Sequence, residues 1–160
     1  MTKVDKLYLA ESPNKFLIMA INWSKESINR GRFPVGALLV CTYKDQEFLY
    51  KGISGNNKNK KHAEQDAIFY TLDSIGEIPS GSILYTSMEP CIMCLTTAYW
   101  FGIKEIHFAI SKNLVNPNYY ESSFSINNIN EKLHVPIKLI HDKEMESLAL
   151  EVVNIWEGLQ

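Results

Sequence analysis

The sequence predicts an α/β fold, because strand-like and helix-like segments alternate along most of its 160 residues. Segment 35–41 is apolar at nearly every position, which is typical of a strand buried on both faces of a sheet. Segment 62–74 carries apolar residues at helical spacing, and segment 91–101 contains neither proline nor glycine. This alternation indicates βαβ units with right-handed crossovers, and the chain length fits one domain, residues 1–160, with an ample core.

The first elements are bounded by typical capping and turn residues. Ser12 and Pro13 suit the N-cap and first position of a helix that we expect to reach about Arg30 and to end at Gly31. Two strands follow, joined by a short polar turn, and a polar loop then leads to the next helix. The expected ranges are 35–43 and 48–53 for the strands, 44–46 for the turn and 55–61 for the loop.

Strands and helices continue to alternate beyond this hairpin. We expect helix 62–74, strand 82–87, helix 91–101, strand 105–110, an irregular stretch 111–130, strand 136–141 and a helix from about 142 to 156. The irregular stretch contains Asn116-Pro117-Asn118 and two tyrosines, and long loops of this kind in compact domains are often functional. The predicted order is α-β-β-α-β-α-β-(α)-β-α.

The composition argues against several classes of protein. The formal net charge is −2 and the pI is near 6.1, so no overall positive field favours nucleic acid. Three cysteines provide no disulfide framework and indicate a reducing compartment. No apolar run approaches the roughly 18 residues that a membrane span needs, and residues 1–11 lack the apolar core of a secretory leader. We therefore expect a cytoplasmic protein without a membrane partner.

Two short motifs carry the chemistry. A His-Ala-Glu triplet beginning at His62 is followed downstream by Pro-Cys-Ile-Met-Cys, which contains Cys91 and Cys94. One imidazole and two thiols can hold Zn²⁺ and leave its fourth position open for water. Glu64 is not needed as a ligand, so its carboxylate is free to move a proton from that water to a substrate. The pattern therefore predicts hydrolytic chemistry.

A redox pair or a structural zinc site would account for these residues less completely. A Cys-x-x-Cys pair can be a redox centre, but this would leave the histidine and Glu64 without a role. A structural zinc usually has four protein ligands, and the only spare thiol, Cys41, lies in a buried strand and is expected to be core. His107, His134 and His141 each stand alone and are expected to be structural or surface residues.

Helix positions support a single site. Cys91 and Cys94 are three residues apart and lie on one helix face, where the positive end of the helix dipole favours their thiolate forms. His62 and Glu64 do not share a helix face. Both are therefore expected to project from the end of their helix.

The two motifs resemble those of the cytidine deaminase-like superfamily, and within it the branch of guanine deaminases and bacterial tRNA adenosine deaminases. The similarity runs from about Asn14 to the C-terminus and includes Phe-Pro-Val-Gly-Ala at 33–37, Asn56 and Leu-Tyr-Thr-Ser-Met-Glu-Pro at 84–90. The resemblance implies a three-layer α/β/α sandwich with a five-stranded mixed sheet, and one Zn²⁺ per chain at the N-termini of two central helices. It also implies a homodimer in which the partner helps to shape the pocket.

The resemblance further implies which residues bind the substrate. Asn56 would hydrogen-bond the base, with Asn57 as the alternative. The walls around the base would be Ala63 and the strand residues Pro34, Val35, Gly36 and Ala37. The lysines of the preceding loop could contact a phosphate, but a charged loop is more often solvated, and we expect the latter for Lys58, Lys60 and Lys61.

One position departs from the guanine deaminase pattern. Guanine deaminases have an acidic residue at the position of Ser122, where it accepts hydrogen bonds from the base. Here the acid comes one residue earlier, at Glu121. Either Glu121 reaches the base in its place, or the substrate is a different amino-heterocycle.

The implied function is hydrolytic release of ammonia from an amino-purine base or related small heterocycle. The alternative is conversion of adenosine to inosine in tRNA, which needs a basic surface because phosphate contacts dominate such binding. The last helix is acidic instead, with Asp142, Glu144, Glu146, Glu151 and Glu157. A third possibility is a non-catalytic zinc-bearing binding module, which would have no need for Glu64.

Overall fold

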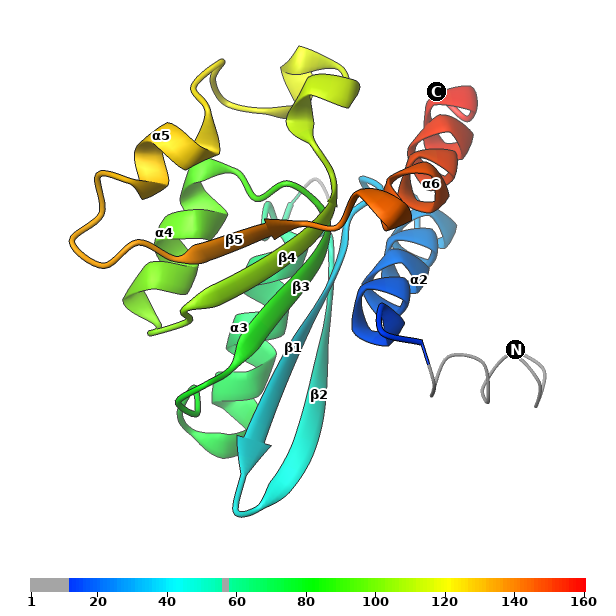
Figure 1. Ribbon diagram of the computed structural model, residues 1–160. Helices are drawn as coiled ribbons and strands as arrows, with labels where there is room; N and C mark the ends of the chain where they lie inside the picture. The colour runs from blue at the N-terminus through cyan, green and yellow to red at the C-terminus, as the bar shows by residue number, and fades with distance from the viewer. Residues whose placement is uncertain (1–11, 56–57) are drawn as a thin grey trace.

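A computed structural model describes residues 12–55 and 58–160, and a five-stranded mixed sheet forms its centre (Figure 1). The strands are β1 (Gly36–Tyr43), β2 (Gln46–Ile53), β3 (Ile83–Met88), β4 (Glu105–Ile110) and β5 (Lys138–His141). They lie in the order β2-β1-β3-β4-β5. Strand β1 is antiparallel to both of its neighbours, whereas β3, β4 and β5 run parallel to one another. The predicted α/β class and mixed sheet are confirmed.

Helices cover both faces of this sheet (Figure 1). They are α2 (Lys15–Asn29), α3 (Ala63–Ile75), α4 (Ile92–Trp100), α5 (Ile126–Asn130) and α6 (Glu146–Gly158), with short 3-10 turns η1 (Lys112–Leu114), η2 (Pro117–Tyr119) and η3 (Lys143–Met145). Helices α2 and α6 lie on one face, and α3 and α4 on the other. Because β1 is covered on both faces, its first six residues are all buried, as its apolar run predicts. Within the described residues, no helix has both the length and the apolar character needed to cross a membrane.

Some predicted boundaries are wrong for local reasons. Helix α2 begins at Lys15 with Asn14 as its N-cap, because the hydroxyl of Ser12 accepts a hydrogen bond from the Asn14 N–H at 3.2 Å and forms a turn before the helix. The predicted hairpin turn 44–46 is shorter, since only Lys44 and Asp45 have positive φ, at 50° and 61°. Gln46 therefore pairs with the last residue of β1 and belongs to β2. The stretch predicted to be irregular contains η1, η2 and α5.

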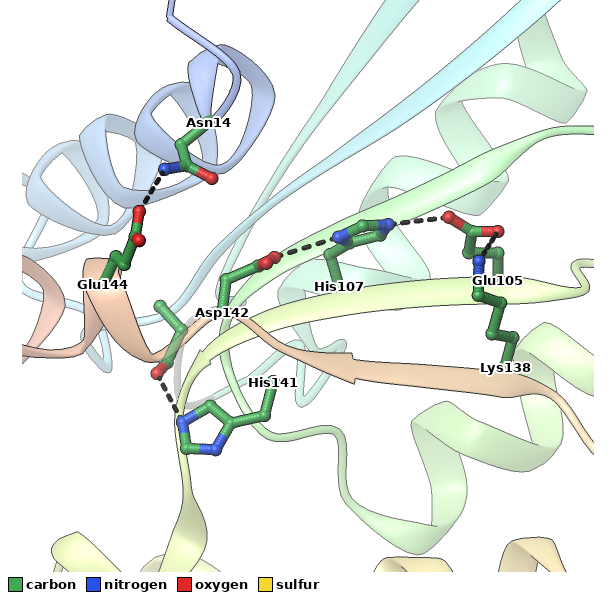
Figure 2. A network of polar contacts seen from close by, with 8 residues as sticks. Asn14, Glu105, His107, Lys138, His141, Asp142 and Glu144 are labelled. Atoms are coloured by element: carbon green, nitrogen blue, oxygen red, sulfur yellow. Dashed lines mark hydrogen bonds and ion pairs between the residues drawn. The ribbon is translucent and has the colours of Figure 1, made fainter.

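Two of the histidines join a polar network that holds β5 and the start of the last helix (Figure 2). His107 lies between two carboxylates, with Nδ1 2.9 Å from Asp142 and Nε2 2.8 Å from Glu105. The Nε2 atom of His141 lies 2.9 Å from a carboxylate oxygen of Glu146. These contacts link β4, β5 and the residues that lead into α6, which agrees with a structural role for both histidines.

Two close contacts determine where α3 begins. Gly52 in β2 lies so near this helix that a Cβ atom there would be 1.9 Å from the carbonyl oxygen of Ala63. Asp66 in the first turn accepts a hydrogen bond from the N–H of Ile53 at 3.1 Å and forms an ion pair with Lys61 at 3.0 Å. The start of α3 is therefore held against the end of β2.

Replacing Gly52 with alanine is expected to lower the free energy of unfolding by about 1–3 kcal/mol, because the added methyl group overlaps the backbone of α3. Gly158→Ala in α6 is the matched control, since nothing lies within 4 Å of the corresponding Cβ position and alanine favours a helix. Urea denaturation of both variants measures the difference. Equal midpoints would contradict the close packing of β2 on α3.

Candidate metal and catalytic site

The two motifs meet at one edge of the sheet. Because β2 and β3 both run antiparallel to β1, their C-terminal ends lie at the same edge, and α3 and α4 begin there. His62 is the N-cap of α3 and Cys91 is the N-cap of α4, so both side chains leave extended backbone immediately before a helix. Cys94 follows in the first turn of α4. Each motif opens a helix, as predicted.

The three predicted ligands have the geometry of a zinc site. The Nδ1 atom of His62 lies 3.4 Å from Cys91 Sγ and 3.5 Å from Cys94 Sγ, and all three donor atoms lie within 4.8 Å of one another. Tetrahedral zinc with Zn–S of about 2.3 Å and Zn–N of about 2.05 Å places nitrogen and sulfur about 3.6 Å apart. In residues 12–55 and 58–160, no other group of three His, Cys, Asp or Glu side chains is arranged to hold a metal. The donor set suits one Zn²⁺ with one position left open.

The first turn of α4 favours a thiolate at Cys91. The side chain of Cys94 and its backbone N–H, 3.5 Å away, hydrogen-bond to the Cys91 sulfur, as does His62. These contacts lower the pKa of Cys91 to about 5 although the residue is buried. A thiolate is the form that binds a metal, so Cys91 is a competent ligand at neutral pH.

The carboxylate of Glu64 faces the same cluster from the other motif. Its Oε2 atom lies 3.4 Å from Cys94 Sγ, and its Oε1 atom accepts a hydrogen bond from the hydroxyl of Thr86 at 3.0 Å. The residue is only 4% exposed, and this burial, with the nearby sulfur of Cys91, raises the pKa of Glu64. A carboxyl group with a raised pKa holds a proton more readily, which suits a group that accepts and returns protons during a reaction.

A cavity of about 730 Å³ opens beside this cluster. Its inner wall, next to the metal donors, is formed by His62, Ala63, Glu64, Glu89 and Cys91. We call the half-buried and exposed residues farther out the outer wall, and these are Arg32, Phe33, Lys60, Tyr119 and Trp156. The cavity therefore places acid–base groups at one end and a mixture of cations and aromatic rings at the other.

Three rings of the outer wall contact one another edge to face. The ring centroid of Phe33 lies 5.1 Å from that of Tyr119 and 5.1 Å from that of Trp156, and the latter two are 5.8 Å apart. Tyr119 also donates a hydrogen bond to Glu157 at 2.6 Å, which raises the pKa of Tyr119 to about 12. These contacts join the turn before β1, η2 and α6 around the cavity mouth.

The predicted wall around the base is only partly present. Ala63 and Val35 line the cavity, but Pro34, Gly36 and Ala37 are buried and do not. Gly36 faces α2 instead, because a Cβ atom there would lie 2.2 Å from a backbone oxygen of that helix. The predicted base readers Asn56 and Asn57 lie outside the described residues.

Glu121 and Ser122 lie near the site but not on the cavity wall. Glu121 accepts a hydrogen bond from the N–H of Ile92 at 2.7 Å and so caps the start of α4. The hydroxyl of Ser122 accepts from the N–H of Phe124 at 3.3 Å. The base-reading role of Glu121 stays a prediction, since its observed contact is with the helix end.

Several residues of the site have no counterpart in the predicted set. Thr86 lies in β3 and Glu89 follows it, and the only hint in the sequence is that the approach to the cysteine motif carries polar residues, namely Thr86, Ser87 and Glu89. No local pattern points to Arg32 or Trp156, because both reach the cavity through long-range packing. Lys60, expected to be merely solvated, lines the cavity.

Comparisons with known proteins agree with this geometry. Residues 10–110 match the family described as the cytidine and deoxycytidylate deaminase zinc-binding region. The chain is 35% identical over 99 residues to a guanine deaminase of Bacillus subtilis, and this alignment covers 59% of the chain and 62% of the relative. It is 30% identical over 96 residues to tRNA-specific adenosine deaminase 2 of Xenopus tropicalis, covering 54% of the chain and 55% of the relative. The alignments thus span little more than half the length of these relatives.

A solved structure supports the fold independently. A guanine deaminase from Nitrosomonas europaea superposes with a TM-score of 0.72 over 92% of this chain and 85% of its own, at 17% identity. The match of residues 10–110 covers more than half of the chain and includes all three metal donors and Glu64. The chain therefore belongs to the family of the cytidine and deoxycytidylate deaminase zinc-binding region.

Proposed function

We propose that this protein is a zinc-dependent hydrolase that releases ammonia from the ring of an amino-purine or a related small heterocycle. The observation that carries the proposal is the buried carboxylate of Glu64, 3.4 Å from the donor atom of Cys94 and on the wall of a 730 Å³ cavity. A carboxylate in this place can serve a bound water and a ring at once. Similarity to a guanine deaminase supports a purine-like ring.

The side chains divide the proposed reaction among them. Bound zinc supplies a water whose pKa is lowered toward about 7. Glu64 takes one proton of the attacking water and passes it to the ring nitrogen as the oxygen bonds to the ring carbon; it then takes the second proton from the hydroxyl on that carbon and passes it to the amino group, which leaves as ammonia while the C=O bond forms. The hydroxyl of Thr86 holds one carboxylate oxygen of Glu64, so the other oxygen is directed toward the donor cluster. The thiolate of Cys91 helps to neutralise the metal charge, so Glu64 can still act as a base.

Adenosine in tRNA is the second candidate substrate, favoured by the similarity to a tRNA-specific adenosine deaminase. The acidic residues of α6, beside the cavity, support a small heterocycle over RNA. A non-catalytic zinc-binding module is the weakest candidate. Burying Glu64 costs free energy, and a purely structural zinc site gives no reason for that cost.

The experiment that tests the proposal is an ammonia-release screen of free bases, nucleosides and an anticodon stem–loop RNA, with zinc measured on the same sample. Release from a free amino-purine or related small ring supports the proposed function. Release only from the RNA would replace it with the second candidate. Zinc-loaded protein that releases ammonia from none of these compounds, nor from any nucleoside monophosphate, would favour the binding module.

Substitution of Cys94 by alanine is expected to abolish zinc binding, because two remaining protein ligands hold the ion poorly. Cys41→Ala is the matched control: Cys41 is also a buried free cysteine, but it lies in β1 outside the donor group. Metal analysis of the purified variants measures zinc per chain. Full occupancy in Cys94→Ala, or loss in Cys41→Ala, would show that the ligands are wrongly assigned.

Replacement of Glu64 by glutamine is expected to keep zinc and fold but to lower turnover by roughly 10²–10⁴-fold, because it removes the proton carrier and no ligand. Glu77→Gln changes an exposed carboxylate and serves as the control. Steady-state rates on the best substrate of the screen, with zinc content, measure both effects. A Glu64→Gln enzyme with normal turnover would remove the proposed role of this residue.

We also propose a cytoplasmic homodimer. Three free cysteines suit a reducing compartment. Met93 and Trp100 lie two turns apart on α4 and expose 42% and 81% of their surface, a stripe that suits contact with a second copy.

Trp100→Lys should therefore shift the protein toward monomer in sedimentation velocity, whereas Ile155→Lys, which replaces an exposed residue of α6, should not. Identical sedimentation of both variants and the unaltered protein would argue against this interface.

A further inference from the structure

Two cations on the cavity wall have no part in the proposed chemistry. Arg32 and Lys60 both line the cavity, and no ion pair involves either of them in residues 12–55 and 58–160. Their neighbours in the sequence are paired: Arg30 lies 2.8 Å from Glu26, and Lys61 lies 3.0 Å from Asp66. The two unpaired charges are therefore available to a bound anion.

Arg32 is held in place by the backbone. One of its guanidinium nitrogens donates a hydrogen bond to the carbonyl oxygen of Ser54 at 3.1 Å. Ser54 is itself buried, and its hydroxyl donates to the carbonyl of Val35 at 3.2 Å. A guanidinium group has five N–H donors in a planar fork, so this single contact orients Arg32 and leaves most donors free.

The backbone also places this cation close to the metal donors. Gly55, directly after Ser54, donates its N–H to the carbonyl of Lys61 at 2.7 Å, and His62 is the next residue. Arg32 is thus linked to His62 by the hydrogen bond to Ser54, the hydrogen bond from Gly55 to Lys61 and two steps between neighbouring residues. With consecutive Cα atoms 3.8 Å apart, this puts Arg32 on the order of 10 Å from the metal donors. One molecule of modest size can therefore contact both ends of the cavity.

The side-chain carboxylates that line the cavity lie next to the metal donors. In the described part of the chain, these are Glu64 and Glu89, both on the inner wall. Glu89 is already used, because its Oε2 atom accepts hydrogen bonds from the N–H of Lys112 at 3.0 Å and the hydroxyl of Ser111 at 3.3 Å. An anion at the outer wall would meet cations, while a ring at the inner wall would meet Glu64.

We propose that the heterocycle deaminated here carries a phosphate, which Arg32 and Lys60 bind while the ring faces Glu64. This inference rests on the proposed deaminase function. The fork of Arg32 matches two phosphate oxygens, and Lys60 adds a point charge. The cavity of about 730 Å³ exceeds what a bare base requires and lies within the range of pockets that enclose larger ligands.

The geometry favours a mononucleotide over RNA as the source of this phosphate. The contacting rings of Phe33, Tyr119 and Trp156 close the outer wall beside Arg32. Glu157 is the residue after Trp156 in the sequence, and its carboxylate accepts a hydrogen bond from the hydroxyl of Tyr119 at 2.6 Å. A carboxylate therefore borders the cavity mouth. A longer phosphate chain would extend beyond Arg32 and Lys60 toward this carboxylate, whereas a single phosphate can be bound by the two cations alone.

The test uses zinc-loaded Glu64→Gln protein, which should bind ligands without converting them. Isothermal titration calorimetry compares the free base, nucleoside and nucleoside 5′-monophosphate of adenine, guanine and cytosine. In at least one series, we expect the monophosphate to bind about 10-fold more tightly than the nucleoside. Adding Arg32→Gln should remove this gain, and Lys60→Gln should reduce it, with nucleoside affinity unchanged. Arg30→Gln removes a nearby charge that is already paired and should change nothing.

Three results would overturn the proposal. These are equal binding of nucleoside and monophosphate in every series, a monophosphate preference that survives Arg32→Gln, and binding of anticodon stem–loop RNA without binding of any monophosphate. Turnover by protein with Glu64 intact separates this proposal from the deaminase function. If ammonia is released from a free base and Arg32→Gln leaves kcat/KM for the corresponding monophosphate unchanged, the deaminase stands and phosphate binding falls. Arg32-dependent monophosphate binding without any ammonia release would instead support the phosphate site and remove the deaminase function.

Discussion

Convergence of two helix starts on one point is the constraint on which the rest of the site depends. The imidazole of His62 comes from α3 and both sulfurs come from α4, yet nitrogen and sulfur lie within 3.5 Å. A shift of α3 by one residue would move its first turn by about 1.5 Å along the axis and rotate it by about 100°, which would break this geometry. The sheet prevents such a shift, because Gly52 admits the helix only at one place and Asp66 bonds it to the end of β2.

The sequence predicts the local part of this arrangement well. Metal donors at helix N-caps, the apolar run of β1 and the βαβ alternation are properties of short segments, and the structure confirms them. The start of α2 differs from the prediction because Ser12 can cap a helix or close a turn, and only the packed structure decides between them. Arg32 and Trp156 could not be predicted, since their place on the cavity depends on contacts between segments far apart in the chain.

Glu89 illustrates how a carboxylate beside a reactive centre can serve the scaffold. Its backbone N–H donates to Ile110 at 2.7 Å, its backbone oxygen accepts from the hydroxyl of Tyr120 at 2.8 Å, and its side chain binds the N–H of Lys112. The residue thereby ties the end of β4 and the segment carrying η2 to the entrance of the cysteine motif. Its place beside the metal donors would suggest a catalytic role, whereas its hydrogen bonds indicate that it holds β4 and the segment carrying η2 in place.

The outer wall is assembled from four separate parts of the chain, namely the turn after α2, the loop before α3, η2 and α6. Any molecule that fills the cavity therefore acts as a non-covalent cross-link between them. A ligand that binds only the folded state adds RT ln(1 + [L]/Kd) to its stability, about 2.7 kcal/mol at 100 times Kd. Ligand binding should stabilise the packing of α6 and η2 on the rest of the fold more than it stabilises β1, because β1 is already covered on both faces. A ligand in the cavity should therefore slow amide hydrogen exchange in the C-terminal helix α6, although this helix is far along the chain from the metal donors.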